Sequence, residues 1–161
     1  MHACTFCECA DMAVEKSRHD TAPIGFYDMP PLVNSAFACE VFLKTILKWF
    51  DIQPPKSHKL KDLYEKLPEE FRKQFEDALL KSYGGTWMGE CGVDYLSTLS
   101  NAFQEFRYFY EHDFRKSGSH YYIETTFLQV FRDALRDCCC RVIFNIGWEQ
   151  YKVLKPIGSK K

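Results

Sequence analysis

The stretch from Leu32 to Phe50 restricts the possible folds of this chain more than any other part of the sequence. It is apolar on nearly all sides and is bounded by proline pairs at positions 30–31 and 54–55. Its unbroken apolar stretches are only a few residues long, which is too short for a bilayer span. A helix that is hydrophobic all round must instead be buried in a protein core. We therefore predict a central, mostly buried helix around which the rest of the chain packs.

The remaining sequence shows helical periodicity of apolar residues but no sustained period-two alternation, so no sheet is predicted. Two short helices are expected around residues 60–67 and 71–79, and two long ones around 93–112 and 120–145. The chain is therefore predicted to be all-α, a helical bundle with about three long and two short helices.

Capping residues indicate where several of these helices begin and end. Ser57 is the predicted N-cap of the first short helix, Pro68 suits the first turn of the second, and Gly147 is the predicted C-cap of the last long helix. The predicted division is an N-terminal segment of uncertain structure, which could be helical, at 1–27, a bundle domain at 28–147, and a C-terminal tail at 148–161 that is either extended or frayed.

Composition and charge exclude several classes of protein. The 161 residues are 46% hydrophobic and 27% charged, which is typical of one soluble globular domain. The formal net charge of −1 provides no overall basic field for nucleic acid, so an RNA site would have to be local. The N-terminus lacks the pattern of a secretory signal, and no membrane segment is expected. A cytoplasmic location is therefore predicted.

The eight cysteines are expected to be reduced thiols, because no export signal accompanies them. His2, Cys4, Cys7 and Cys9 have spacings that fit a zinc site poorly, so no metal or other cofactor is predicted. Three consecutive cysteines at 138–140 splay around a helix and cannot share one ion. Cys138 is predicted to lie in the core, with its two neighbours at the flanks.

Three segments together resemble the HEPN family of small helical domains. They are Ala36-Phe37-Ala38-Cys39-Glu40-Val41-Phe42-Leu43-Lys44, His58-Lys59-Leu60-Lys61-Asp62-Leu63 and Phe106-Arg107-Tyr108-Phe109-Tyr110-Glu111, in that order. The resemblance covers roughly residues 28–145. It implies an antiparallel helical bundle, often a homodimer.

Many HEPN members are metal-independent ribonucleases of toxin–antitoxin or antiphage systems that use an Arg and a His separated by a few residues. The resemblance thus implicates Arg107 and His112 as the catalytic pair, with Glu40 as a polar partner of Arg107 from the facing helix. It also implies an RNA substrate and a cognate antitoxin or nucleotidyltransferase-like partner. The chemistry is consistent, because a His can transfer protons near neutral pH and an Arg can hold a phosphate through two hydrogen bonds.

Two interpretations of these residues stay open. On an ideal helix Arg107 and His112 do not share a face, and Tyr108 stands where catalytic members often have a small polar residue. Arg107 could instead pair with Glu111 four residues later, and other HEPN members are non-catalytic modules that bind a nucleotide, RNA or protein. The alternative function is such a binding module.

The polar residues of the other two segments have their own expected roles. Glu40 and Lys44 are spaced to form an i, i+4 pair on the central helix, where each either faces solvent or has a partner. His58 precedes a short helix, and a capping or surface role is expected for it rather than catalysis.

Overall fold

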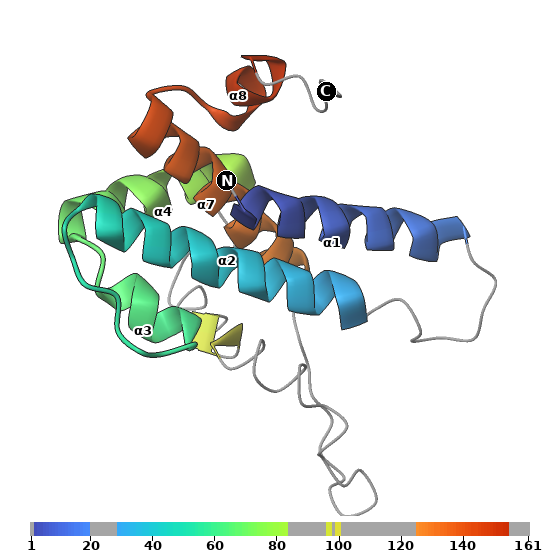
Figure 1. Cartoon of the computed structure of the whole chain (residues 1–161), viewed down its shortest axis with the longest axis horizontal. Coiled ribbons are helices and arrows are strands. Elements are labelled where there is room, and N and C mark those ends of the chain that lie inside the picture. Colours follow the sequence, from blue (N-terminus) through green and yellow to red (C-terminus); the bar gives the residue numbers. More distant parts are fainter. Residues whose placement is uncertain (1, 20–28, 84–95, 98, 101–124, 155–161) are drawn as a thin grey trace, which may run out of the picture.

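The computed structural model describes residues 2–19, 29–83, 96, 97, 99, 100 and 125–154, and these form a bundle of α-helices without a β-strand (Figure 1). The prediction of an all-α bundle is therefore confirmed. The helices are α1 (His2–His19), α2 (Met29–Trp49), α3 (Leu60–Glu65), α4 (Glu69–Tyr83), α7 (Thr125–Phe144) and α8 (Trp148–Leu154).

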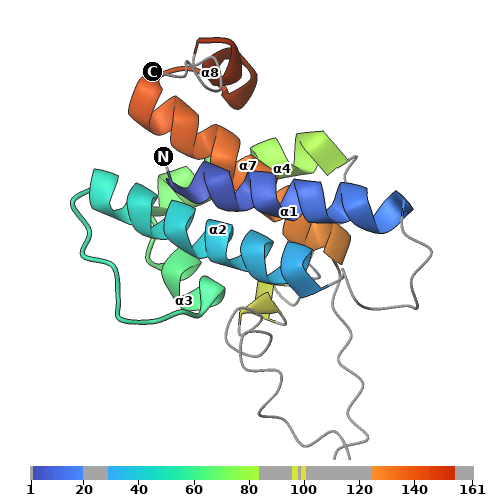
Figure 2. The ribbon, with the colours of Figure 1, turned by 45° about the vertical axis from the view of Figure 1, so that its right-hand side comes forward.

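Helix α2 is the central element, as its all-round hydrophobicity predicts. It packs along α1, which runs antiparallel to it, and it also contacts α7 and α3 (Figures 1 and 2). Ala38, Phe42, Leu43 and Leu47 have no exposed surface, although at about 100° per residue they are spread over roughly half of the helix circumference. Burial on several sides explains why this helix carries almost no polar residue in its middle.

Aromatic side chains from three helices fill the centre of the core. Phe131 of α7 meets Phe75 of α4 edge to face, with ring centroids 5.4 Å apart, and meets Tyr64 of α3 at 6.0 Å. Edge-to-face pairs of this kind add to the stabilisation that apolar burial provides. The Tyr64 hydroxyl donates a hydrogen bond of 2.6 Å to Glu76, so the polar end of this ring is satisfied at the edge of the core.

A residue with a left-handed backbone conformation ends helix α2. Asp51 has a φ of 56° and follows the end of α2, where the backbone N–H of Ile52 donates to the carbonyl of Leu47. This is the hydrogen bond of a Schellman motif, which favours glycine at the left-handed position. The helix thus ends a few residues before the proline pair at 54–55 that was expected to break it.

Several local predictions differ from the structure. The segment at 1–27 contains a long helix, α1, in agreement with the helical alternative left open for it, whereas the tail that was expected to be extended or frayed contains α8, whose Trp148 and Tyr151 rings stack 5.9 Å apart. The N-cap position of α3 is Lys59 rather than Ser57. Gly147, the predicted C-cap of the last long helix, instead directly precedes α8, and its carbonyl accepts from Tyr151 N at 3.0 Å.

The cysteines near the end of α7 also pack differently from the prediction. Cys139 and Cys140 are buried, whereas Cys138 is only partly buried. Helix α4 buries only the narrow face of Phe71, Phe75 and Leu79, and Ala78 beside it is exposed.

Candidate functional site

Glu40 is a carboxylate buried in the central helix, and two basic side chains share one of its oxygen atoms. Oε1 of Glu40 accepts from Lys44 Nζ at 2.7 Å and from His58 Nδ1 at 2.9 Å. The Glu40 side chain is only 4% exposed, whereas the ring of His58 is 48% exposed. We call these three residues the Glu40 cluster. It joins a rigid, buried acceptor to a ring that solvent can reach.

The second oxygen of Glu40 has unused hydrogen-bonding capacity. Oε2 is buried, and none of the residues that the structure describes donates a hydrogen bond to it. A buried carboxylate oxygen without a donor is costly, because burial removes the water that would otherwise solvate it. The Glu40 cluster therefore has one unused acceptor atom at a fixed position on α2.

The chain just after His58 is held in place by the segment at 96–100. The carbonyl of Ser100 accepts from Leu60 N at 3.2 Å, and its hydroxyl accepts from Lys61 N at 3.1 Å. These two contacts satisfy N–H groups at the first turn of α3, where the side chain of the N-cap residue, Lys59, makes no capping hydrogen bond. Lys61 Nζ also donates to the hydroxyl of Ser97 at 2.9 Å. Hydrogen bonds therefore connect the start of α3 to Ser97 and Ser100, which precede Arg107 in the sequence.

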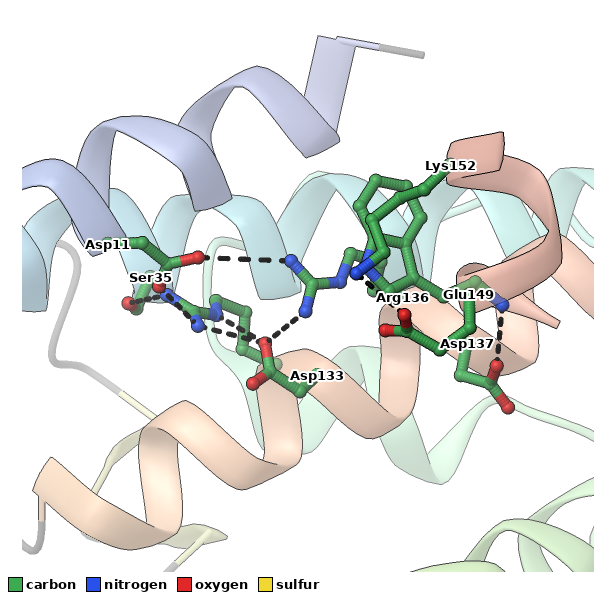
Figure 3. Close-up of polar contacts among 9 residues, drawn as sticks. Asp11, Ser35, Asp133, Arg136, Asp137, Glu149 and Lys152 are labelled. Atoms are coloured by element: carbon green, nitrogen blue, oxygen red, sulfur yellow. Dashed lines mark hydrogen bonds and ion pairs between the residues drawn. The ribbon is translucent and has the colours of Figure 1, made fainter. Parts of the chain in front are cut away.

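A second polar cluster lies on the other side of the bundle, between α1, α2 and α7 (Figure 3). The guanidinium of Arg132 is 4% exposed; its Nη2 atom lies 2.7 Å from Asp11 and 2.8 Å from Asp133, and its Nη1 atom donates to Ser35. Arg136 pairs with Asp133 at 3.1 Å. We call these five residues the Arg132 network. Its central cation is enclosed and fully engaged by protein groups, so its role is structural.

Electrostatics in this region favour a charged arginine and neutral thiols. Burial lowers the pKa of Arg132, but Asp133 and Asp11 outweigh that effect and raise it above its ordinary value. Burial raises the pKa of the neighbouring Cys7 to about 12 and that of Cys139 to about 12. These buried thiols are therefore protonated at neutral pH and lack the thiolate that nucleophilic or metal-binding cysteines need.

Helix α8 is fastened to α7 by capping and by a cation–π contact. Oδ1 of Asp137 accepts from Trp148 N at 2.7 Å, and the guanidinium carbon of Arg136 lies 4.5 Å from the centre of the Trp148 ring. A pocket of about 370 Å³ lies between α4, α7 and α8. The carboxylates that line it pair with basic residues of the chain, as Glu149 does with Lys152 (Figure 3).

The structure brings together Glu40 and Lys44 as their spacing predicts, and it adds His58 to them. Arg107, Tyr108, Glu111 and His112 lie outside the described residues. The role of His58 was missed, because Glu40 lies 18 positions earlier in the sequence and no local pattern links the two. An available signal was the isolated glutamate in an otherwise apolar helix, since a buried carboxylate needs basic partners.

Comparison of the chain with protein-family models, with curated proteins and with solved structures gives no match in any of the three. Within the described part of the chain, no helix combines the length and the apolar character that crossing a bilayer requires. Groups of three or more His, Cys, Asp or Glu side chains placed to hold a metal ion do not occur among the same residues.

Proposed function

We propose that this chain is a HEPN-like, metal-independent endoribonuclease, acting in toxin–antitoxin or phage defence as a cytoplasmic homodimer. Arg107 would hold the reacting phosphate, and His112 would transfer a proton. The observation that carries the proposal is the buried carboxylate of Glu40, whose Oε2 atom lacks a donor among the described residues.

A guanidinium is the group that best completes such a site. Arginine stays charged under all physiological conditions and presents paired N–H donors to a carboxylate or a phosphate. An arginine that used one edge of its guanidinium on Glu40 would keep other donors for a phosphate. The resemblance to HEPN domains implies this pairing of Glu40 with Arg107.

The length of the connecting chain is compatible with that pairing. Ser100 is fastened beside Leu60, two residues after His58, and Arg107 follows Ser100 by seven residues. Seven residues span at most about 25 Å when extended and about 10 Å when helical. Arg107 is therefore within reach of the Glu40 cluster.

The surroundings of the cluster suit a polyanion. Lys56, Lys59 and Lys61 accompany His58 in the sequence Lys56-Ser57-His58-Lys59-Leu60-Lys61, and Lys56 and Lys59 are exposed. Lys44 contributes a further positive charge on α2, where its side chain is 29% exposed. Local positive charge of this kind attracts a phosphate backbone even though the chain as a whole is close to neutral.

The reaction would begin with attack of a ribose 2′-oxygen on the adjacent phosphorus. The bond between phosphorus and the 5′-oxygen then breaks, leaving a 2′,3′-cyclic phosphate and a 5′-hydroxyl. A fixed guanidinium stabilises the extra negative charge at phosphorus in the transition state, and a histidine moves a proton near neutral pH.

The test is cleavage of a mixed RNA pool by purified protein in EDTA, compared with the Arg107→Ala and His112→Ala variants. The proposal predicts cleavage by the wild type and a loss of about 100-fold or more in each variant. The matched controls are Arg141→Ala and His2→Ala, which remove exposed side chains from elsewhere in the bundle.

An intact RNA pool, or equal cleavage by all five proteins, would contradict the nuclease function. The alternative is then a non-catalytic module that binds a nucleotide, RNA or protein partner such as an antitoxin or nucleotidyltransferase-like protein. Retained RNA binding by the wild type, weakened by Arg107→Ala, would identify RNA as the ligand of that module.

A further inference from the structure

We infer that His58 is a second proton-transfer residue of the proposed ribonuclease and delivers a proton to the departing 5′-oxygen. The inference rests on the proposed function and extends it. The observation behind it is the hydrogen bond that joins a half-exposed imidazole to the buried carboxylate of Glu40.

Cleavage of RNA by its own 2′-hydroxyl requires two proton movements. One proton leaves the attacking 2′-oxygen, and another reaches the 5′-oxygen as its bond to phosphorus breaks. His112 provides only one group for these two tasks. If His112 takes the proton from the 2′-oxygen, a different residue in its protonated form must donate to the 5′-oxygen, and solvent resets both groups afterwards.

The Glu40 cluster has the form of a carboxylate–imidazole pair suited to this task. A buried carboxylate that accepts from Nδ1 fixes the orientation of the ring and leaves proton transfer to Nε2, as in carboxylate–histidine pairs of other catalytic sites. Glu40 is held rigidly by the central helix, while 48% of the His58 side chain remains exposed. The ring is therefore oriented by a buried carboxylate while about half of its surface is exposed.

Other described histidine and acidic groups fit the task less well. His2 is exposed at the beginning of α1. Asp11 and Asp133 are engaged by Arg132. Lys44 shares Oε1 of Glu40 with His58, and its hydrogen bond to the carboxylate helps to hold Glu40 in position.

The decisive variant is His58→Asn, because an asparagine amide nitrogen occupies nearly the position of Nδ1. It can still donate to Oε1 of Glu40 but has no equivalent of Nε2. A structural role would survive this substitution, whereas a proton-transfer role would not. The His112→Asn variant serves as a comparison, and His2→Ala serves as a control for loss of an unrelated histidine.

Each protein is assayed in EDTA on two short RNAs that differ at a single atom. One has the ordinary 5′-oxygen at the cleavage position, and the other has a bridging sulfur there, which leaves without a proton. We expect His58→Asn to be slower than wild type by about 100-fold or more on the oxygen substrate and within about threefold of wild type on the sulfur substrate. His112→Asn should be slow on both.

Retained cleavage of the oxygen substrate by His58→Asn would overturn the inference, as would an equal loss on both substrates by a variant that melts like the wild type. If His58→Asn melts at a lower temperature, His58→Ala with added imidazole replaces it, and the inference then requires imidazole to restore cleavage of the oxygen substrate. A wild type that cleaves neither substrate overturns the ribonuclease function itself, and this inference with it.

Discussion

Nδ1 of His58 lies 2.9 Å from Oε1 of Glu40, and this contact joins the loop before α3 to the buried centre of α2. The relationship is unusual because one partner is almost entirely enclosed while the other is half exposed. A carboxylate buried only to stabilise the fold would be expected to have both oxygens satisfied. The Glu40 cluster instead leaves Oε2 without a donor among the described residues, as expected for a site that is completed by another group.

The first prediction separates stability from function at Glu40. Removing one member of a buried ion pair is costly when its partner stays buried, but Lys44 and His58 are 29% and 48% exposed and can be solvated once an apolar residue of similar size replaces Glu40. Glu40→Met should therefore change the free energy of unfolding by less than about 1 kcal/mol while lowering RNA cleavage by at least about tenfold. Urea unfolding and the cleavage assay in EDTA measure the two effects.

Glu69→Met, a change at an exposed position of α4, is the matched control and should alter neither quantity. Loss of several kcal/mol of stability in Glu40→Met, with cleavage reduced only in proportion to the unfolded fraction, would show that Glu40 serves the fold alone.

The second prediction concerns the Arg132 network. Removing Arg132 leaves the hydroxyl of Ser35 buried without its donor and leaves Asp133 and Asp11 without their closest cation. Truncating this buried side chain to alanine also leaves a cavity, and large-to-small substitutions at buried positions cost about 2–5 kcal/mol, so Arg132→Ala should lower the free energy of unfolding by about that amount. Arg141→Ala, which removes a 65% exposed arginine from the same helix, should cost less than about 0.5 kcal/mol. Similar losses in both variants would contradict the structural role of the network.

The third prediction is that the fold loses stability in alkaline solution through its buried thiols. Burial raises the pKa of Cys7 and Cys139 to about 12 and that of Cys138 to about 11. The unfolded chain ionises these thiols above about pH 8.5, whereas the folded chain keeps them protonated. Because the folded state then binds more protons, the free energy of unfolding falls with rising pH, and the loss continues up to the raised pKa values.

Each such thiol should contribute a loss of about 1.4 kcal/mol per pH unit within that window. Urea unfolding at several pH values between 8 and 10.5 gives the slope. Cys7→Ala should reduce the slope, and Cys9→Ala, at an exposed position, should leave it unchanged. A slope that is the same in all three proteins would show that the buried thiols are not responsible.

The fourth prediction is a gain in stability at the end of α2. Asp51 has a φ of 56°, a conformation that glycine adopts without strain, and its negative charge lies at the negative end of the helix dipole. Asp51→Gly should therefore raise the free energy of unfolding by about 0.5–1 kcal/mol. Asn145→Gly, at the second non-glycine position with positive φ among the described residues, should gain less, because asparagine tolerates this conformation. A lower melting temperature for Asp51→Gly would contradict the assignment.

The sequence was sufficient to predict the features that depend on local periodicity. The central helix is recognisable because few residues between Leu32 and Phe50 can face water, and α4 is recognisable from Pro68 and the acidic pair that follows it. Helix α1 was not predicted with certainty, because its small and polar residues give a weak apolar face, and only packing against α2 selects it. Helix α8 depends in the same way on a distant residue, Asp137, which caps it.

The candidate site was only partly predictable for a similar reason. The i, i+4 pair of Glu40 and Lys44 follows from helix geometry alone. The contact between His58 and Glu40 depends on how the α2–α3 loop folds back, and the fastening of Lys61 by Ser97 and Ser100 joins positions more than 35 residues apart. Contacts of this range are set by tertiary packing, and a single sequence does not encode them in a local pattern.

The product of RNA cleavage by the wild-type protein in EDTA reveals whether the ribose 2′-oxygen is the attacking group. A short RNA with one susceptible linkage is compared with the same RNA carrying a 2′-deoxyribose at that linkage. We expect a 2′,3′-cyclic phosphate from the all-ribose RNA and no cleavage of the RNA with the 2′-deoxyribose. An uncut all-ribose RNA, or equal cleavage of both substrates, would contradict the proposed ribonuclease function.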